Sequence, residues 1–202
     1  MRYPKLRELK EALTAVFSKR YTTRFPKVAH KPPKGFRGKP EPDEEWCIGC
    51  EACMEVCPAN AIVIEDDRAG GKRIIRRFYD KCIFCGQCES ECPQEKPGVV
   101  MSTQYDLADY TADSMQTVQE FELIVCSRCG ASIGTRDQLL QTSKRIGPAL
   151  SSANPEMILV RQKSIGFGQH PSKKREEFTR ADIFAFLCPS CRHKVYTEEA
   201  NR

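Results

Sequence analysis

The sequence predicts an α+β fold in which short helices and strands are organised around cysteine-bound metal. Two observations carry this prediction: a four-cysteine motif occurs twice in the middle of the chain, and two further cysteine pairs follow towards the C-terminal end. A third observation, an amphipathic basic segment at the N-terminal end, predicts a helix outside the cysteine-rich part. The 202 residues suffice for one ordinary domain or two small ones.

Both copies of the motif have the pattern C-x-x-C-x-x-C-x-x-x-C-P. They lie 35 residues apart and agree at six of twelve positions, which indicates an internal duplication. Bacterial ferredoxins with two [4Fe–4S] clusters carry the same run. We therefore predict a duplicated bacterial 2[4Fe–4S] ferredoxin-like domain over residues 43–103. Its eight cysteines are Cys47, Cys50, Cys53, Cys57, Cys82, Cys85, Cys88 and Cys92.

The spacing also predicts which cysteines share a cluster. The first three thiolates of such a run bind one cluster, whereas the fourth cysteine ligates the other cluster. Two zinc knuckles or a disulfide framework are the alternatives. Knuckles lack the third and fourth cysteines, and disulfide frameworks occur in shorter secreted chains. The predicted ligand sets are Cys47, Cys50, Cys53 and Cys92 for cluster 1, and Cys82, Cys85, Cys88 and Cys57 for cluster 2.

Short strands are expected beside the two motifs. After the first motif, residues 61–65 and 73–79 have the composition of two strands joined by a turn. Residues 98–101 are expected to form the matching strand after the second motif. Ile48 and Ile83 occupy equivalent places in the two motifs, and we expect both to pack against the clusters, where apolar neighbours limit the access of water.

The remaining cysteines form two C-x-x-C pairs that suit a closed tetrahedral site with four sulfur ligands. Zinc is the first choice, because such sites are its usual structural environment. One iron ion, held as in rubredoxin, fits the same thiolates and remains the alternative. His170 and His193 are less favoured ligands, since four cysteines are available. The cysteines of this site are Cys126, Cys129, Cys188 and Cys191.

This zinc-ribbon or rubredoxin-like knuckle domain is expected over residues 123–202, after a linker over residues 104–122. Residues 137–146 and 180–187 have helical character, and residues 166–175 are predicted to be a surface loop.

The N-terminal region, residues 1–42, is predicted to contain a basic amphipathic helix within residues 5–19, followed by an extended proline-rich arm without regular structure. Residues 1–40 carry a net charge of +10, whereas residues 41–202 carry −5. Such an arm suits a membrane surface, an acidic partner subunit or nucleic acid. A merely solvated arm and a helix packed on its own core are the alternatives. The apolar stripe comprises Leu6, Leu9, Leu13, Val16 and Phe17.

Two classes of protein are not expected. No run of about 18 apolar residues occurs, so no membrane-spanning helix is predicted. The first residues carry charge throughout and lack the apolar core of a secretory signal. Iron–sulfur clusters and reduced thiols together predict a reducing, cytoplasmic environment.

Several short stretches give the chain a family resemblance: residues 36–41 before the first motif, its opening at 47–50, the start of the second motif at 82–86, and residues 104–108. With these, the chain resembles the two-cluster ferredoxin subunit shared by respiratory complex I and the group 4 membrane-bound [NiFe] hydrogenases. The C-terminal cysteine pairs make it similar to the ferredoxin-like subunit of formate hydrogenlyase. Residues 94–98 depart from the family pattern by extra residues after Cys92.

The resemblance implies an electron-transfer subunit without catalytic residues of its own. Its clusters would bridge an electron-input ferredoxin-like subunit and the hydrogenase small subunit, and catalysis would belong to the nickel–iron large subunit. The N-terminal helix would lie on the inner face of the cytoplasmic membrane. A complex I-type subunit and a free two-cluster ferredoxin are the alternatives. Nucleic acid is not an expected partner, because no basic patch with interleaved aromatic residues surrounds the C-terminal cysteines.

Overall fold

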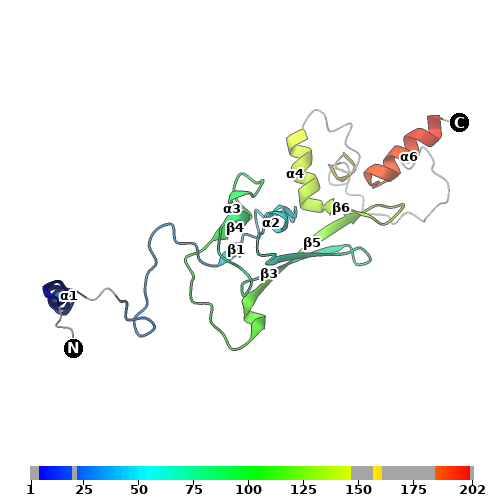
Figure 1. The fold of residues 1–202 in the computed structure, drawn as a ribbon. Coiled ribbons are helices and arrows are strands. Elements are labelled where there is room, and N and C mark those ends of the chain that lie inside the picture. Colours follow the sequence, from blue (N-terminus) through cyan, green and yellow to red (C-terminus); the bar gives the residue numbers. More distant parts are fainter. Residues whose placement is uncertain (1–4, 20–21, 147–156, 161–184, 201–202) are drawn as a thin grey trace. The chain divides into compact units, whose positions relative to one another are not determined.

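The computed structural model describes residues 5–19, 22–146, 157–160 and 185–200 (Figure 1). The chain divides into two compact units, residues 1–36 and residues 37–202. Among the described helices, none combines the length and the apolar character that crossing a bilayer requires.

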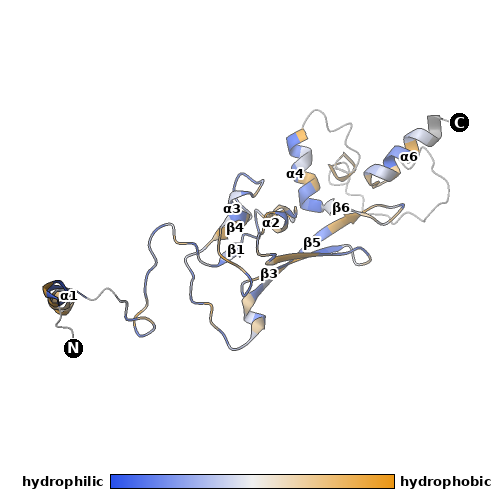
Figure 2. Ribbon diagram, in the orientation of Figure 1, coloured by the Kyte–Doolittle hydropathy of each residue, from blue (hydrophilic) through white to orange (hydrophobic). Residues whose placement is uncertain are grey.

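The first unit contains helix α1, which spans Leu6–Phe17. At its start, the backbone N–H of Lys5 donates to the Glu8 carboxylate at 3.1 Å, so this N–H group has an acceptor. No residue of α1 is buried. Figure 2 shows that the helix carries both hydrophobic and hydrophilic residues. The exposed apolar side chains are Leu6, Leu9, Leu13, Val16 and Phe17, with exposed fractions of 86%, 53%, 52%, 75% and 85%.

The second unit is built on a four-stranded antiparallel sheet of order β2-β3-β5-β6. The two strands predicted after the first motif are confirmed as a hairpin, with Ile64 opposite Ile75. The turn between them is closed by the Asp67 carboxylate, which accepts hydrogen bonds from two backbone N–H groups. The strands are β2 (Ile62–Asp67), β3 (Lys72–Phe78), β5 (Gln116–Val125) and β6 (Ser132–Thr135).

Strand β5 corrects the sequence prediction for residues 116–122, which we assigned to a linker. These residues pair along β3, with Val118 opposite Arg76, and the Lys72 ammonium lies 2.8 Å from the Glu120 carboxylate. The segment is polar because much of this part of the strand is solvated. Its hydrophobic end, next to β6, enters the core (Figure 2). A short 3-10 helix, Ala112–Met115, precedes the strand.

A second, two-stranded sheet pairs β1 (Pro40–Pro42) with β4 (Val99–Met101). The strand expected after the second motif is therefore present. Its partner comes from the proline-rich stretch, for which no regular structure was expected. Proline is tolerated in β1 because, among the described strands, β1 pairs only with β4 and does not need donors on its other side.

The C-terminal part packs on the end of the large sheet. Helix α4 (Arg136–Ile146) matches the helix predicted over residues 137–146. Helix α6 spans Pro189–Ala200, and residues 185–187 before it are not helical, so the helix predicted over 180–187 is wrong in its described part. Proline suits the first helical position, which explains the later start. Residues 180–184 and the loop predicted over 166–175 lie outside the described residues. One core cluster comprises Ile124, Leu139, Ile158, Leu159 and Phe186.

Candidate metal centres

The two cysteine motifs have the same backbone conformation, as expected for a duplication. In the first motif, Gly49 and Glu51 adopt left-handed φ angles of 66° and 72°. The equivalent residues of the second motif, Phe84 and Gly86, adopt φ angles of 54° and 80°. A four-residue helix follows each pair, α2 (Ala52–Glu55) and α3 (Gln87–Ser90). These turns set the direction of the cysteine side chains.

Each motif retains glycine at only one of its two left-handed positions. A side chain at Gly49 would place its Cβ 2.9 Å from the Thr135 Cγ2 atom, and one at Gly86 would place it 3.3 Å from the Arg37 Cδ atom. Both positions therefore combine a conformation that favours glycine with a close neighbour.

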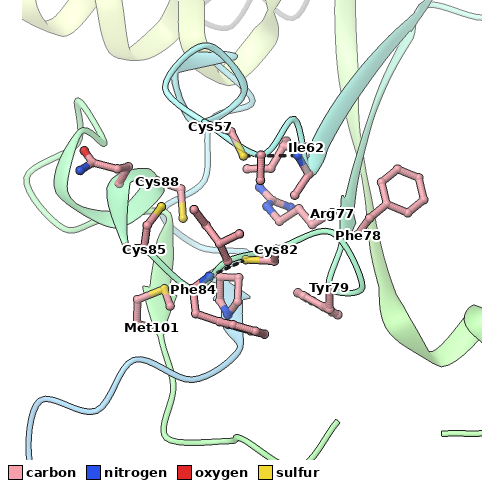
Figure 3. Close-up of a pocket in the computed structure, with 16 residues that line it drawn as sticks. Cys57, Ile62, Arg77, Phe78, Tyr79, Cys82, Phe84, Cys85, Cys88 and Met101 are labelled. Atoms are coloured by element: carbon pink, nitrogen blue, oxygen red, sulfur yellow. Dashed lines mark hydrogen bonds between the residues drawn. The ribbon is translucent and has the colours of Figure 1, made fainter. Parts of the chain in front are cut away.

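Four cysteines of the predicted cluster 2 line one cavity of about 450 Å³, here called the Cys57 cavity. Figure 3 shows the sulfur-bearing side chains around this space, together with apolar side chains such as Phe84 and Met101. Ile83 also lines the cavity, although 62% of its side chain is exposed. The lining cysteines are Cys57, Cys82, Cys85 and Cys88.

A second cavity, of about 350 Å³, is called the Cys92 cavity. Trp46, Ile48, Ile75 and Val99 give it an apolar lining, so water has limited access to the sulfur atoms. Cys88 borders this cavity as well as the Cys57 cavity. The other lining cysteines are Cys47, Cys50, Cys53 and Cys92.

Four of the thiols that line these cavities are hard to ionise without a metal. Burial raises the pKa values of Cys50, Cys53 and Cys82, and it raises the pKa of Cys88 to about 11. Neighbouring thiols add to these shifts because several negative charges at one place repel each other. A bound metal centre removes this penalty, since metals bind the deprotonated sulfur. The chemistry of this donor set therefore fits an iron–sulfur cluster.

Backbone N–H groups point at three of the sulfur atoms. Ala61 donates to the Cys57 sulfur at 3.3 Å and Gly98 donates to the Cys92 sulfur at 3.2 Å. The fourth cysteine of each motif thus receives an equivalent bond, despite the extra residues 94–98 of the second half. Phe84 donates to Cys82 at 3.4 Å. Hydrogen bonds to cluster sulfur atoms are one of the means by which a protein sets reduction potentials.

The C-terminal cysteines differ from the motif cysteines because they converge on one point. Their four sulfur atoms lie within 4.8 Å of one another, and those of Cys129 and Cys188 are 3.6 Å apart. Tetrahedral zinc with Zn–S bonds of about 2.3 Å places its sulfur ligands about 3.8 Å apart. Within the described residues, this is the only group of three or more potential ligands close enough to share one ion. His193 is exposed on α6 outside this group, and His170 lies outside the described residues.

Two of the four C-terminal thiols differ in their pKa values. Burial raises the pKa of Cys126, but hydrogen bonds from the backbone N–H groups of Cys129, Cys188 and Arg128 outweigh it and lower the pKa to about 7. Burial and the neighbouring thiols raise the pKa of Cys191. One thiol is therefore easily ionised, while another keeps its proton until a cation displaces it.

The C-terminal part also holds the loop of the first motif. Thr135, at the end of β6, is fully buried, and its hydroxyl donates to the Ile48 carbonyl oxygen. The Arg145 guanidinium on α4 donates to the carbonyl oxygen of Pro93, next to Cys92. Both contacts are made to segments that carry ligands of the Cys92 cavity. Sequence reasoning missed them, because contacts between distant segments leave no local pattern.

Two buried arginines were also missed. Arg73 and Arg77 on β3 have exposed fractions of 4% and 1% and lie on the same face as the buried Ile75. Arg73 donates to the Asp66 carboxylate at 2.7 and 2.9 Å and to the Gly49 carbonyl oxygen at 3.0 Å. Its guanidinium also lies 2.5 Å from the Glu51 carboxylate. The alternation of residues 73, 75 and 77 was the available signal.

Comparison with known families supports this description of the site. Residues 46–96 match the family described as the 4Fe-4S dicluster domain. A chain in the solved structure of the membrane-bound sulfane sulfur reductase, an archaeal respiratory membrane complex, aligns with a TM-score of 0.41 and 24% identity. That alignment covers 57% of this chain and 61% of the other.

Two relatives extend the match beyond the cysteine motifs. The sequence is 32% identical over 125 residues to NADH-quinone oxidoreductase subunit I 2 of Geobacter metallireducens, covering 58% of this chain and 94% of that protein. It is 34% identical over 106 residues to formate hydrogenlyase subunit 6 of Escherichia coli, covering 52% of this chain and 58% of that protein. The chain therefore belongs to the family of iron–sulfur subunits represented by NADH-quinone oxidoreductase subunit I.

Proposed function

We propose that this chain is the electron-transfer subunit of a membrane-bound [NiFe] hydrogenase complex of the formate hydrogenlyase type. The observation that carries the proposal is the pair of adjoining cavities, which are lined by four and by five cysteines of the duplicated motif and share Cys88. When bound, two [4Fe–4S] clusters supply reversible one-electron transfer. The side chains around them hold the ligands, exclude water and donate hydrogen bonds to sulfur.

The proposed ligation is crossed. Cys47, Cys50 and Cys53 share cluster 1 with Cys92, while the second motif shares cluster 2 with Cys57. The lining of the two cavities supports this arrangement, because each fourth cysteine lies with the first three cysteines of the other motif.

The C-terminal site is proposed to hold one structural zinc ion, with iron as the alternative. Its closed group of four sulfur atoms suits such an ion, and the contacts of Thr135 and Arg145 connect the surrounding fold to the Cys92 cavity. This site also favours the hydrogenase assignment over a complex I-type subunit, because a C-terminal cysteine domain is the feature that resembles formate hydrogenlyase. Complex I-type NADH or ferredoxin:quinone oxidoreductase remains the second candidate, since one match, over 125 residues, is to such a subunit.

Helix α1 is proposed to bind the inner face of the cytoplasmic membrane beside the partner subunits. An isolated 12-residue helix is marginally stable in water, and its apolar stripe is exposed. A surface that buries this stripe would stabilise the helix, and anionic lipid would attract the basic arm. These properties favour a membrane-associated subunit over a freely diffusing ferredoxin.

Purification of the native complex under anaerobic conditions tests the assignment. We expect a nickel-containing large subunit, a small subunit and an electron-input subunit to copurify with this chain. Copurification with NADH- or quinone-reactive subunits and no nickel would favour the complex I-type alternative.

Metal analysis tests the cofactors of the chain itself. Two clusters of four irons require about eight irons and eight sulfides per chain, and the C-terminal site adds one zinc or one iron. These amounts are measured by elemental analysis and acid-labile sulfide on anaerobically purified protein. Zinc in both cavities and no sulfide would contradict the proposal.

Removal of residues 1–36 tests the role of α1. The deletion ends before Arg37, whose guanidinium donates to the Cys85 carbonyl oxygen, and it spares β1. We expect the shortened protein to leave the membrane fraction while its cluster absorption is unchanged. A full-length L9Q/L13Q variant, which disrupts only the apolar stripe, should behave alike. Unchanged membrane association of both variants would contradict this role.

A further inference from the structure

We propose that Arg77 is a fixed cation between the two cluster sites and that its charge raises the reduction potentials of both clusters. The inference rests on the proposed binding of two clusters. Its first element is the position of Arg77 between the two cavities. Arg77 is 1% exposed on the inward face of β3 and lines the Cys57 cavity (Figure 3). One of its terminal nitrogens also lies 4.0 Å from the sulfur of Cys47, which lines the Cys92 cavity.

The second element is the lack of a carboxylate partner for Arg77 among the described residues. Arg77 has one hydrogen bond to a neutral oxygen, the Gln119 side-chain carbonyl at 2.7 Å. Its Nε atom is buried without a hydrogen-bond partner, and no carboxylate of the described residues forms an ion pair with it. Arginine keeps its charge at all ordinary pH values, so this charge is not relieved by loss of a proton.

Arg73 provides the contrast, since it lies on the same strand and face with 4% exposure. Two carboxylates, from Asp66 and Glu51, neutralise it. The fold therefore surrounds one buried arginine with acidic groups and leaves the other facing sulfur atoms. A buried cation without a partner is strongly destabilising, so Arg77 requires negative charge from the sites that it faces.

The sulfur atoms around Arg77 supply that charge when they bind clusters. Arg77 lines the Cys57 cavity, and its terminal nitrogen lies 4.0 Å from the Cys47 sulfur of the Cys92 cavity, so it faces cysteines of both motifs. Arg77 thus acts on both cavities at once. A thiolate-ligated cluster is negatively charged and becomes more so on reduction, so a nearby fixed cation favours the reduced form. Because the site is shielded from solvent, this effect is little screened.

One variant removes the charge of Arg77, and a second neutralises it. R77Q shortens the side chain and keeps a donor for Gln119. Q119E keeps the arginine and places a carboxylate where the Gln119 oxygen now accepts its hydrogen bond, so the pair becomes neutral. The matched control is R76M, which removes the same charge from the opposite, partly exposed face of β3, where Arg76 pairs with Glu65 at 3.6 Å.

The measurement is the midpoint potential of each cluster, obtained by redox titration with electron paramagnetic resonance on the natively purified complex. We expect R77Q and Q119E to lower both potentials by about 59 mV, a tenfold change in the reduction equilibrium of a one-electron couple. R76M should leave them unchanged. If R77Q does not assemble its clusters, Q119E decides alone. An iron-replete variant, R77Q or Q119E, with wild-type potentials would overturn the inference, whereas a wild-type protein without clusters would overturn the proposed function instead.

Discussion

A C57A/C82A double variant will retain about four irons in its clusters, whereas a C57A/C53A double variant will retain almost none. The proposed crossed ligation places Cys57 and Cys82 on one cluster, so their joint removal would damage only that cluster. In the same proposal, Cys57 and Cys53 bind different clusters, although they belong to the same motif. The iron and sulfide contents of the purified variants, with electron paramagnetic resonance of the reduced proteins, measure the result.

Uncrossed ligation predicts the reverse outcome. In that case C57A/C53A would keep one cluster and C57A/C82A would lose both. The reciprocal pair, C92A/C47A and C92A/C88A, serves as the matched control, with one cluster expected in the former and none in the latter. Both variants in each comparison carry two cysteine-to-alanine substitutions. A general loss of stability would therefore lower the iron content of both, and only the ligation pattern would make them differ.

We expect loss of the proposed C-terminal metal to unfold the end of the chain and to loosen the proposed cluster 1 more than cluster 2. Substitution C191S removes one of four converging sulfur ligands, and small domains of this kind derive much of their folding free energy from the metal. Strand β5 stays in place because it pairs with β3, so we expect unfolding to begin near residue 126. Limited proteolysis and metal analysis would report the loss.

The two clusters should respond differently because Thr135 and Arg145 donate hydrogen bonds to Ile48 and Pro93, which lie in segments that line the Cys92 cavity. We expect iron in this cavity to be released to a chelator several-fold faster in C191S, while both clusters remain reducible. H193Q is the control, since His193 is exposed and outside the cysteine group, and it should behave as wild type. Equal release from both cavities would contradict the supporting role of the C-terminal part.

Spectroscopy of the C-terminal site decides its metal and its role. Zinc gives no electron paramagnetic resonance signal, whereas ferric iron in sulfur coordination gives a high-spin signal. A reversible iron signal during turnover would make the site a third electron carrier and contradict its structural role.

The sequence predicted those parts of the molecule that short-range patterns specify. The cysteine motifs, the β2–β3 hairpin and helix α4 have such patterns. Strand β5 was missed because Gln116, Glu120 and Glu122 make a half-solvated strand resemble a polar linker. Strand β1 was missed because its two prolines are acceptable only beside a single partner strand, which the local sequence does not reveal.

The burial of Arg77 illustrates the same limit at the site. A charged residue in a strand is normally exposed, and only the neighbouring segments decide whether it is enclosed. The alternation of Arg73, Ile75 and Arg77 was visible, but choosing which face of β3 turns inward required knowledge of β5 and of the cavities.

The placement of the retained glycines has a consequence for the symmetry of the molecule. The two motifs of the duplicated core have left-handed residues at equivalent positions. Gly49 occurs where Thr135, from the C-terminal part, lies close to the first motif. Gly86 occurs where Arg37, from the N-terminal side of the core, lies close to the second motif. The segments outside the core therefore break its pseudosymmetry. An exchange of the two halves, which an isolated core would tolerate, would place Phe84 beneath Thr135 and Glu51 against Arg37 in this chain.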